Sequence, residues 1–383
     1  MRITLLIPSL QAGGAERVLS IMAHYWMARG DEITIISLDA PTVAPFYALD
    51  SRLMHKQLNL LKPSQGISQA IVHNIRRLFS IRSAIRISRP HVVISLTDKM
   101  NVLVLMATVG LPIPILVAEH NDPSQVQIKK IWSVLRSVMY RRAASIVVLT
   151  SNVVSFFGMD IYNRIRVIPN PIALDPHSVP VIRSSHNSGI NMLIAVGRLE
   201  KQKGFDLLLS AFSRAVAEHP NWHLTIWGEG NCRAELVALK RKLGLDEQVH
   251  LPGITKEVFA EMSRADLFVL SSRYEGFPMV LCEAMACGLP VVSFDCPSGP
   301  RDIIRDGIDG FLVPPGDEAG LAAALSRLMG DAAERARLAL RAPDVLERFG
   351  LEQVMAQWDG LLAEVLPAAA GQRAPDLQRE SLR

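Results

Sequence analysis

The sequence has little of what builds disulfide frameworks, metal centres or membrane spans. Its four cysteines include no Cys-x-x-Cys pair and none at the Cys/His spacing of a zinc site. The uncharged apolar segment 102–118 is 17 residues long, at the lower limit for crossing a bilayer, and it is broken by Gly110, Pro112 and Pro114. We therefore expect free thiols, no structural zinc and no membrane-spanning helix.

Three local patterns are also absent. No Asp-x-Asp pair for a metal-bridged diphosphate occurs in the chain, which favours chemistry that needs no metal. No Gly-x-Gly-x-x-Gly follows the first apolar run, which argues against a dinucleotide oxidoreductase. That run, Met1–Pro8, is short and meets a glycine turn, so it predicts a buried first strand rather than a secretory signal, in a cytoplasmic protein.

The net charge of +4 hides an uneven distribution. Residues 1–175 carry 19 Lys and Arg against 10 Asp and Glu, whereas residues 176–383 carry 22 against 27. A basic first half indicates an anionic partner. We favour an anionic membrane surface on the inner face of the cytoplasmic membrane, because no helix-turn-helix, zinc or RNA-recognition signature supports nucleic acid.

Short β-branched runs alternate with helical patterns along the chain, which is typical of parallel sheets with crossover helices. Because 383 residues exceed the usual size of one core, we predict an α/β fold with two doubly wound Rossmann-like domains facing a cleft. The expected strands are Ile3–Ile7, Glu32–Ser37, His91–Leu96, Ile115–Glu119, Ser145–Leu149, Arg166–Ile168, Asn191–Val196, His223–Trp227, Val249–Leu251, Leu267–Leu270 and Pro290–Phe294.

A segment rich in Pro, Ser, Asn and His separates the two patterns. It predicts a hinge at 171–189 between a first domain at 1–170 and a second at 190–350. Residues 351–366 are expected to form a helix that crosses back to the first domain. Residues 367–383, rich in Ala, Pro, Gln and Arg, are expected to be disordered.

Two glutamates eight residues apart, Glu275 and Glu283, are the most informative feature. A Gly-Phe-Pro turn follows the first, and a small-residue helix carries the second. Such a turn leaves backbone N–H groups beside a helix N-terminus, where a diphosphate can bind. Each carboxylate can accept hydrogen bonds from hydroxyls on one side of that diphosphate. A nucleotide-sugar has this arrangement of groups.

The spacing and its context resemble the E-x7-E signature of the retaining GT-B glycosyltransferases of family 4, which act in bacterial exopolysaccharide and lipid-linked oligosaccharide assembly. The resemblance covers most of the chain. Its motifs are Gly13-Gly-Ala-Glu-Arg17, Val196-Gly-Arg198, Lys201-Gln-Lys-Gly204, Trp227-Gly-Glu-Gly230, Glu275-Gly-Phe-Pro-Met-Val-Leu-Cys-Glu283 and Asp309-Gly-Phe-Leu-Val313.

The resemblance implies a retaining hexosyltransferase that moves a hexose or N-acetylhexosamine from a nucleotide-sugar, expected to be UDP-linked, to a polyprenyl-diphosphate-linked glycan. It implies no cofactor and no metal ion. Glu275 would then bind donor-sugar hydroxyls, Glu283 the ribose, and the pair Arg198 and Lys203 the diphosphate charge. The other expected donor-binding residues are Gly14, Glu229, Ile254, Gly276, Phe277, Pro278, Met279 and Val280.

His120 follows a predicted buried strand, in Glu-His-Asn-Asp. A lone histidine is more often structural, but the resemblance places this one near the reacting end of the sugar, with Glu275 as its catalytic partner. No carboxylate is clearly placed as a nucleophile. We therefore favour a same-face substitution, in which the departing phosphate takes the acceptor proton, over a double displacement.

Two basic amphipathic stretches, Ile67–Arg89 and Ile128–Arg142, predict helices that either pack on the sheet or lie on a lipid surface. We favour the lipid surface because of the uneven charge. The expected acceptor and lipid residues are Glu16, Arg76, Arg77, Arg82, Lys129 and Lys130. Two alternative functions stay open: a UDP-sugar 2-epimerase-like isomerase and a non-catalytic nucleotide-sugar-binding partner.

Overall fold

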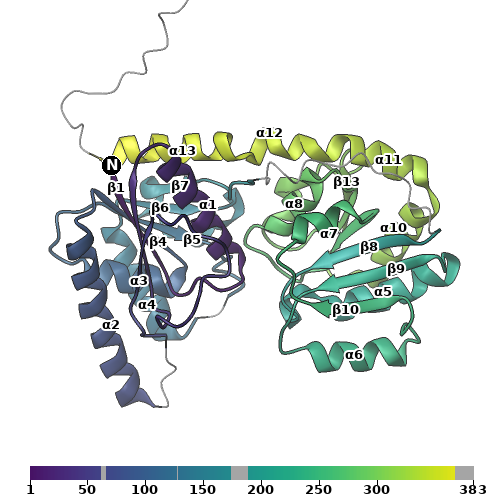
Figure 1. Ribbon diagram of the computed structural model, residues 1–383, viewed down its shortest axis with the longest axis horizontal. Coiled ribbons are helices and arrows are strands. Elements are labelled where there is room, and N and C mark those ends of the chain that lie inside the picture. Colours follow the sequence, from purple (N-terminus) through teal and green to yellow (C-terminus); the bar gives the residue numbers. More distant parts are fainter. Residues whose placement is uncertain (62–65, 127, 174–188, 367–383) are drawn as a thin grey trace, which may run out of the picture.

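The computed structural model describes residues 1–61, 66–126, 128–173 and 189–366 as two α/β domains side by side (Figure 1). Each domain has one sheet in which all paired strands are parallel. The strand order is β3-β2-β1-β4-β5-β6-β7 in the first sheet and β10-β9-β8-β11-β12-β13 in the second. The predicted fold class is confirmed.

The strands of the first sheet are β1 Arg2–Ile7, β2 Glu32–Ser37, β3 Met54–Gln57, β4 Val92–Leu96, β5 Ile115–Glu119, β6 Ser145–Val148 and β7 Ile165–Val167. The strands of the second sheet are β8 Asn191–Val196, β9 Trp222–Trp227, β10 Val249–Gly253, β11 Leu267–Leu270, β12 Val291–Phe294 and β13 Gly310–Val313.

The α-helices of the first domain are α1 Gly14–Ala28, α2 Ile67–Ser88, α3 Asp98–Ala107 and α4 Lys130–Met139. Those that follow are α5 Phe205–Glu218, α6 Arg233–Lys242, α7 Val258–Ser263, α8 Met279–Ala286, α9 Pro300–Ile303, α10 Glu318–Gly330, α11 Ala332–Arg341, α12 Val345–Phe349 and α13 Leu351–Val365. The 3-10 turns are η1 Tyr140–Arg142, η2 Ser151–Phe156, η3 Tyr162–Arg164, η4 Lys201–Lys203 and η5 Ala342–Asp344.

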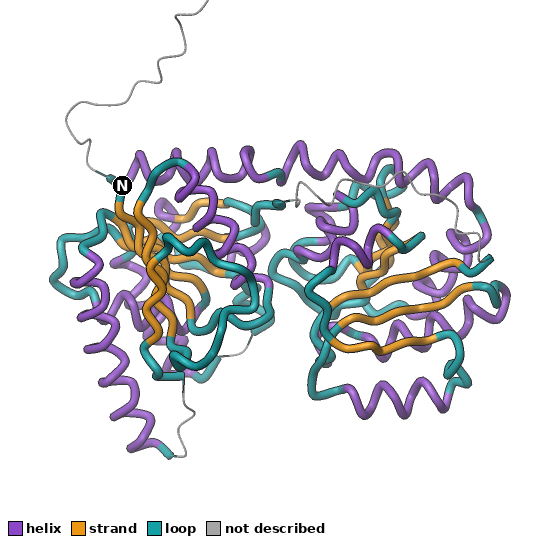
Figure 2. Tube along the Cα trace, viewed as in Figure 1, coloured by secondary structure: helices purple, strands orange, loops and turns teal. Residues whose placement is uncertain are grey.

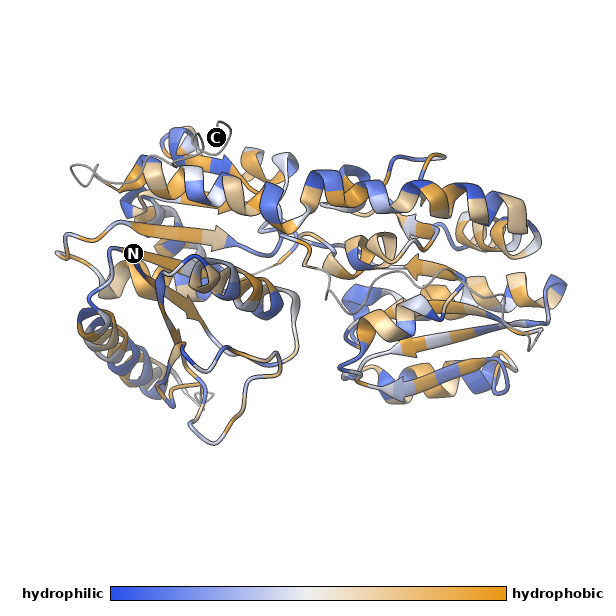
Figure 3. Ribbon diagram, turned by 45° about the horizontal axis from the view of Figure 1, so that its top comes forward, coloured by the Kyte–Doolittle hydropathy of each residue, from blue (hydrophilic) through white to orange (hydrophobic). Residues whose placement is uncertain are grey.

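Helices cover both faces of each sheet, which explains why the strands are apolar runs rather than alternating ones (Figure 2). In the first domain, α2, α3 and α4 pack on one face, and α1 with α13 on the other. In the second, α5 and α10 pack on one face, and α7 and α8 on the other. One hydrophobic core contains residues of both domains, from Trp26 of α1 to Met285 of α8. The hydrophobic colouring follows the strands in both domains (Figure 3).

Helix α13 joins the second domain to the first (Figure 1). Trp358 packs edge-on against Trp26 of α1 at 6.4 Å between ring centroids, and the Trp26 indole donates to Asp359 at 2.9 Å. The chain passes between the domains twice, near Ile172 and near Phe349. These two segments lie side by side, and the Ile172 N–H donates to the Phe349 carbonyl at 2.8 Å. Most of the predicted hinge, 174–188, and the predicted tail, 367–383, lie outside the described residues.

The structure corrects the strand predictions at one edge of each sheet. Strand β3 was not predicted because Met54-His-Lys-Gln has no apolar run; it pairs on one side only, with β2. Strand β13 was not predicted because it directly follows the turn of Asp306 to Asp309. It is an edge strand of the second sheet and pairs with β12. No helix of the described chain is both long and apolar enough to cross a membrane.

Candidate active site

The sheets face each other across a cleft at the carboxyl ends of their strands. In each sheet the strand order reverses at one point, between β1 and β4 in the first and between β8 and β11 in the second. Loops that follow these strands line a cavity of about 1050 Å³. Open α/β sheets bind ligands in this position, and the volume lies at the upper end of the range for ligand pockets.

Glu275 follows β11 and is the most strongly held acidic side chain in the cleft. Its carboxylate pairs with the Lys203 ammonium at 2.7 Å and accepts a hydrogen bond from the Ser272 hydroxyl. The Glu275 N–H donates to the Pro297 carbonyl at 3.1 Å. Glu275 is only 5% exposed, so its position is fixed by contacts and not by solvent. This arrangement preorganises a carboxylate and a cation at one point of the cleft.

Two glycines allow the loops that carry Arg198 and Lys203 to pack closely. A Cβ on Gly204, whose φ is +62°, would lie 2.0 Å from the Ser271 carbonyl oxygen. A Cβ on Gly228, whose φ is +148°, would lie 1.9 Å from the Gly197 carbonyl oxygen. Both positions therefore need glycine for conformation and for space. The Arg198 side chain remains largely exposed above them, 3.4 Å from Glu200.

Glu283 lies on α8, which begins at Met279 without a side-chain N-cap. The first N–H groups of a helix have no partner within the helix, and Met279 and Val280 line the cleft. The Glu283 carboxylate is buried, and its contact is the Arg17 guanidinium of α1 at 3.0 Å. Burial raises the pKa of Glu283, and Arg17 opposes that rise. The helix thus offers both an anion site and a buried carboxylate.

His120 follows β5 and lines the cleft, and within the described part of the chain neither ring nitrogen has a hydrogen-bond partner. Burial lowers the pKa of His120 to about 4, so the imidazole is neutral at physiological pH. An unpartnered buried nitrogen is costly, which makes the ring available to a ligand. The preceding residue, Glu119, accepts a hydrogen bond from Tyr140, and burial raises its pKa to about 7.

The first domain contributes the loop after β1 and the end of β4. Gly14 and Glu16 line the cleft, and burial raises the pKa of Glu16. Thr97 also lines it with φ of +75°, a conformation that costs energy for a residue with a side chain. Strained residues of this kind cluster at functional sites.

The domains touch at the base of the cleft. A Cβ on Gly276 would lie 2.4 Å from the His120 carbonyl oxygen, so only glycine lets these loops approach. The Ser298 hydroxyl donates to the Asp122 carboxylate at 2.7 Å, and both side chains are buried. The two predicted catalytic residues are therefore brought to one place by contacts between domains.

The structure brings the predicted catalytic and donor residues to one cavity. Its lining includes Gly14, Glu16, His120, Arg198, Lys203, Glu229, Ile254, Glu275, Gly276, Phe277, Pro278, Met279, Val280 and Glu283. Glu229 also pairs with Arg233 at 2.8 Å. The roles given to these residues stay predictions.

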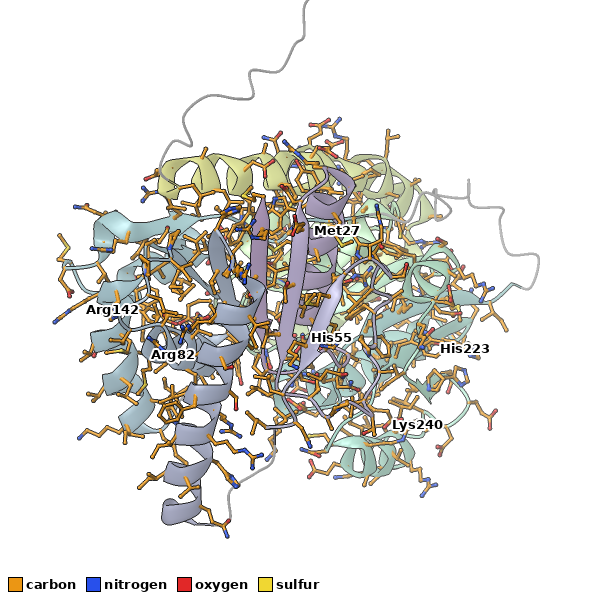
Figure 4. The ribbon with its side chains drawn as sticks, turned by 60° about the vertical axis from the view of Figure 1, so that its left-hand side comes forward. Met27, His55, Arg82, Arg142, His223 and Lys240 are labelled. Atoms are coloured by element: carbon orange, nitrogen blue, oxygen red, sulfur yellow. The ribbon has the colours of Figure 1, made fainter. Side chains whose placement is uncertain are left out.

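The other predicted acceptor residues lie on the outer face of the first domain, away from the cleft. Arg76, Lys129 and Lys130 are exposed. Arg77 and Arg82 turn toward the domain and donate to backbone carbonyls, Arg77 to Leu60 at 2.8 Å and Arg82 to Ala107 at 2.7 Å. Figure 4 looks onto this face and labels Arg82 and Arg142, with His223 and Lys240 on the opposite side of the view.

Apolar side chains are exposed among these basic residues. On α2, Leu78 and Ile85 face the domain, whereas Ile71, Ile75 and Phe79 are exposed. Packing on the sheet therefore explains only part of the apolar stripe. On α4, the exposed apolar residues are Ile131, Val134 and Val138, which share one helix face.

Several cleft residues were not among the predicted ones. They include the Arg17 side chain, Tyr47, Thr97, Lys256, Phe259 and, beside the cleft, Ser272, Asp122 and Ser298. Arg17 belongs to the Gly-Gly-Ala-Glu-Arg motif, which could have singled it out. The others have no local pattern, because their positions depend on how the domains meet.

Comparison with known proteins gives two family matches that together span most of the chain. Residues 12–176 match the model of Glycosyltransferase Family 4, and residues 181–345 match that of Glycosyl transferases group 1. The two matches follow the division into two sheets.

Individual relatives match over nearly the full length. The chain is 28% identical, over 95% of its length and 99% of the relative's, to a Campylobacter jejuni GalNAc-α-(1→4)-GalNAc-α-(1→3)-diNAcBac-PP-undecaprenol α-1,4-N-acetyl-D-galactosaminyltransferase. It is 27% identical, over 92% and 96%, to the amylovoran biosynthesis glycosyltransferase AmsD of Erwinia amylovora. The crystal structure of Anabaena HepE with UDP and glucose superposes with a TM-score of 0.76 at 20% identity, over 94% and 99%.

Proposed function

Since this chain belongs to the GT-B glycosyltransferases that join a family 4 domain to a group 1 domain, we propose that it moves a hexose or N-acetylhexosamine from a UDP-sugar to a lipid-linked glycan. The product would be a surface polysaccharide or related glycan. The observation that carries this proposal is the buried Glu275–Lys203 pair beside the start of α8, in a cleft with Glu283. The name of the Campylobacter relative supports a lipid-linked acceptor, and that of the Erwinia relative supports a role in polysaccharide biosynthesis. UDP in the Anabaena structure supports the donor.

In this proposal different residues bind the donor sugar and the ribose, which flank the diphosphate. Glu275 accepts hydrogen bonds from donor-sugar hydroxyls, and Glu283 accepts them from the ribose. Arg198 and Lys203 stabilise the charge that develops on the leaving diphosphate, together with N–H groups at the start of α8. Because these two cations can stabilise the diphosphate charge without a metal ion, we propose that transfer is metal-independent.

We propose that transfer retains the anomeric configuration. The acceptor hydroxyl attacks the anomeric carbon on the face from which the diphosphate departs, and a diphosphate oxygen takes the hydroxyl proton. His120, neutral because burial lowers its pKa to about 4, donates a hydrogen bond to the sugar near this carbon. Trapping a covalent glycosyl-enzyme would contradict this mechanism.

Release of UDP tests the proposed function directly. The protein is incubated with a panel of UDP-sugars, with and without a polyprenyl-diphosphate-oligosaccharide fraction from bacterial membranes, in buffer containing a metal chelator. We expect UDP release from one sugar, only with the lipid fraction, and no effect of the chelator. Isomerisation of a UDP-sugar without acceptor would support the 2-epimerase instead.

We further propose that α2 and α4 lie on the inner face of the cytoplasmic membrane. The support is the set of exposed apolar residues on α4, Ile131, Val134 and Val138, next to the exposed cations Lys129 and Lys130. Apolar side chains interleaved with cations on a helix are typical of lipid interfaces. An acceptor carried by a membrane lipid would then be presented to the first domain.

Charge removal on α4 should weaken vesicle binding. A basic residue near an anionic surface contributes about 1 kcal/mol, so the double variant Lys129→Gln/Lys130→Gln should bind anionic vesicles about 30-fold more weakly. The matched control is Arg241→Gln/Lys242→Gln on the exposed end of α6 in the second domain. Cosedimentation with phosphatidylglycerol-containing vesicles measures the difference. Equal binding by both double variants would contradict the proposal.

A further inference from the structure

Arg17 is the residue through which the first domain reaches Glu283 of the second. Its guanidinium lies 3.0 Å from the carboxylate, and both side chains are largely shielded from solvent, with 18% and 2% exposed. Apart from this contact, neither Glu283 oxygen has a hydrogen-bond partner among the described residues. Both residues line the cleft. A buried carboxylate with four acceptor positions and one cation is therefore turned toward the ligand space.

Aromatic rings from both domains hold the guanidinium in place. It lies over Phe259 of α7 at 4.9 Å and over Tyr47 of the first domain at 5.9 Å, measured to the ring centroids. The Tyr47 hydroxyl donates to the Gly13 carbonyl at 3.2 Å, which ties the ring to the start of α1. Cation–π contacts of this kind favour one orientation of an arginine. The side chain is thus positioned, and its position depends on both domains.

The charge of Glu283 depends on this contact. Burial favours the protonated carboxyl and raises its pKa, and Arg17 is the charged group that opposes the rise. Tyr47 and Cys282 also face this carboxyl, but burial raises the pKa of each, so both stay neutral near pH 7. The other ionisable groups on the elements packed against α8 are Glu261, Arg301, Asp302, Asp344, Glu347 and Arg348.

We propose that Arg17 is a positioning residue whose guanidinium, carried by the first domain, keeps the Glu283 carboxylate ready to accept both ribose hydroxyls of a nucleoside diphosphate. The ribose end of the donor is therefore bound in full only while the first domain holds Arg17 beside Glu283. This inference rests on the proposed function, which assigns the ribose to Glu283. An ionised carboxylate accepts two hydroxyl donors, whereas a protonated one uses part of its capacity to donate.

The test compares UDP with its 2′-deoxy and 3′-deoxy analogues by calorimetry on the full chain. A hydrogen bond to a charged group contributes about 1.5–3 kcal/mol, so the wild type should lose about 10- to 150-fold in affinity with either analogue. In Arg17→Met, UDP itself should bind more weakly, and the penalty for either analogue should shrink to about threefold or less. Arg17→Lys keeps a cation and should retain most of the penalty.

The pH dependence of UDP affinity distinguishes this role from a merely structural one, which would leave that dependence unchanged. Without Arg17 the pKa of Glu283 rises further, because burial is no longer opposed, so the carboxyl is protonated over a wider pH range. UDP affinity of Arg17→Met should therefore increase as the pH is raised, whereas that of the wild type should change less. The double variant with Glu283→Gln should bind UDP no more weakly than Glu283→Gln alone.

The possible outcomes distinguish the assignment of the ribose to Glu283 from the role proposed for Arg17. A wild type that binds UDP and both deoxy analogues equally would contradict the assignment of ribose to Glu283, and with it the inference. A wild type that discriminates, with Arg17→Met discriminating equally and without pH dependence, would overturn the inference alone. Arg241→Met, on the exposed end of α6, is the matched control and should behave as the wild type. Thermal melting of each variant verifies folding, and Arg17→Gln, which also removes the cation, serves if Arg17→Met does not fold.

Discussion

Replacing Glu275 by glutamine is expected to lower kcat/KM for sugar transfer by about a hundred- to a thousandfold, because one preorganised polar group in a reacting site contributes about 3–4 kcal/mol. Glu275 is buried and paired with Lys203 at 2.7 Å. Glutamine keeps the shape but loses the charge, and it leaves Lys203 without its counter-ion. The amide also accepts fewer hydrogen bonds from sugar hydroxyls. Initial rates of UDP release at several donor concentrations measure the loss.

The matched control is Glu247→Gln, an exposed carboxylate outside the cleft. It should retain wild-type kcat/KM. Breaking a buried ion pair can also destabilise the fold by about 3–5 kcal/mol, so the melting temperature of Glu275→Gln is measured alongside. A folded Glu275→Gln protein with activity within about tenfold of the wild type would show that Glu275 does not act on the reacting sugar.

Replacing Arg198 by glutamine is expected to lower kcat by about a hundred- to a thousandfold while leaving the fold intact. The guanidinium side chain is 59% exposed in the cleft, and its hydrogen bonds are long, 3.4 Å to Glu200 and 3.5 Å to Gln202, so little of the fold depends on it. Arg198 is proposed to stabilise the transition state, in which the departing diphosphate gains negative charge. An interaction made mainly there affects kcat more than binding of the intact donor.

Arg241→Gln is the control for Arg198→Gln, because it removes one exposed guanidinium from the second domain without touching the cleft. Unfolding midpoints of both variants should equal that of the wild type. If Arg198→Gln raised KM for the donor but left kcat unchanged, the residue would bind the ground state and transition state equally. That result would contradict its proposed role.

The sequence predicted the fold well where a strand is buried on both faces. Asn191–Val196 and Leu267–Leu270 are central, so their residues form continuous apolar runs that stand out from the helical periods around them. The edge strands β3 and β13 pair on one side only, so a continuous apolar run is less strongly required of them. Met54-His-Lys-Gln alternates exposure without an apolar run, and no local rule separates it from a loop.

The candidate site was predictable where a motif follows a central strand. Glu275, Arg198 and His120 come shortly after β11, β8 and β5, and the carboxyl ends of parallel strands meet at one edge. The contacts between domains were not predictable in this way. The hydrogen bond of Ser298 to Asp122 joins residues 176 positions apart. Likewise, the basic amphipathic helices α2 and α4 could be outlined from the sequence, but not which of their arginines turn inward, as Arg82 does.

The most direct test of sugar transfer is the mass of the lipid-linked glycan after incubation with the UDP-sugar that supports UDP release. We expect the glycan to gain one hexose or one N-acetylhexosamine with the wild type, and to gain nothing with Glu275→Gln over the same time. A donor that is consumed or isomerised while the mass of the glycan stays unchanged would contradict sugar transfer to the glycan.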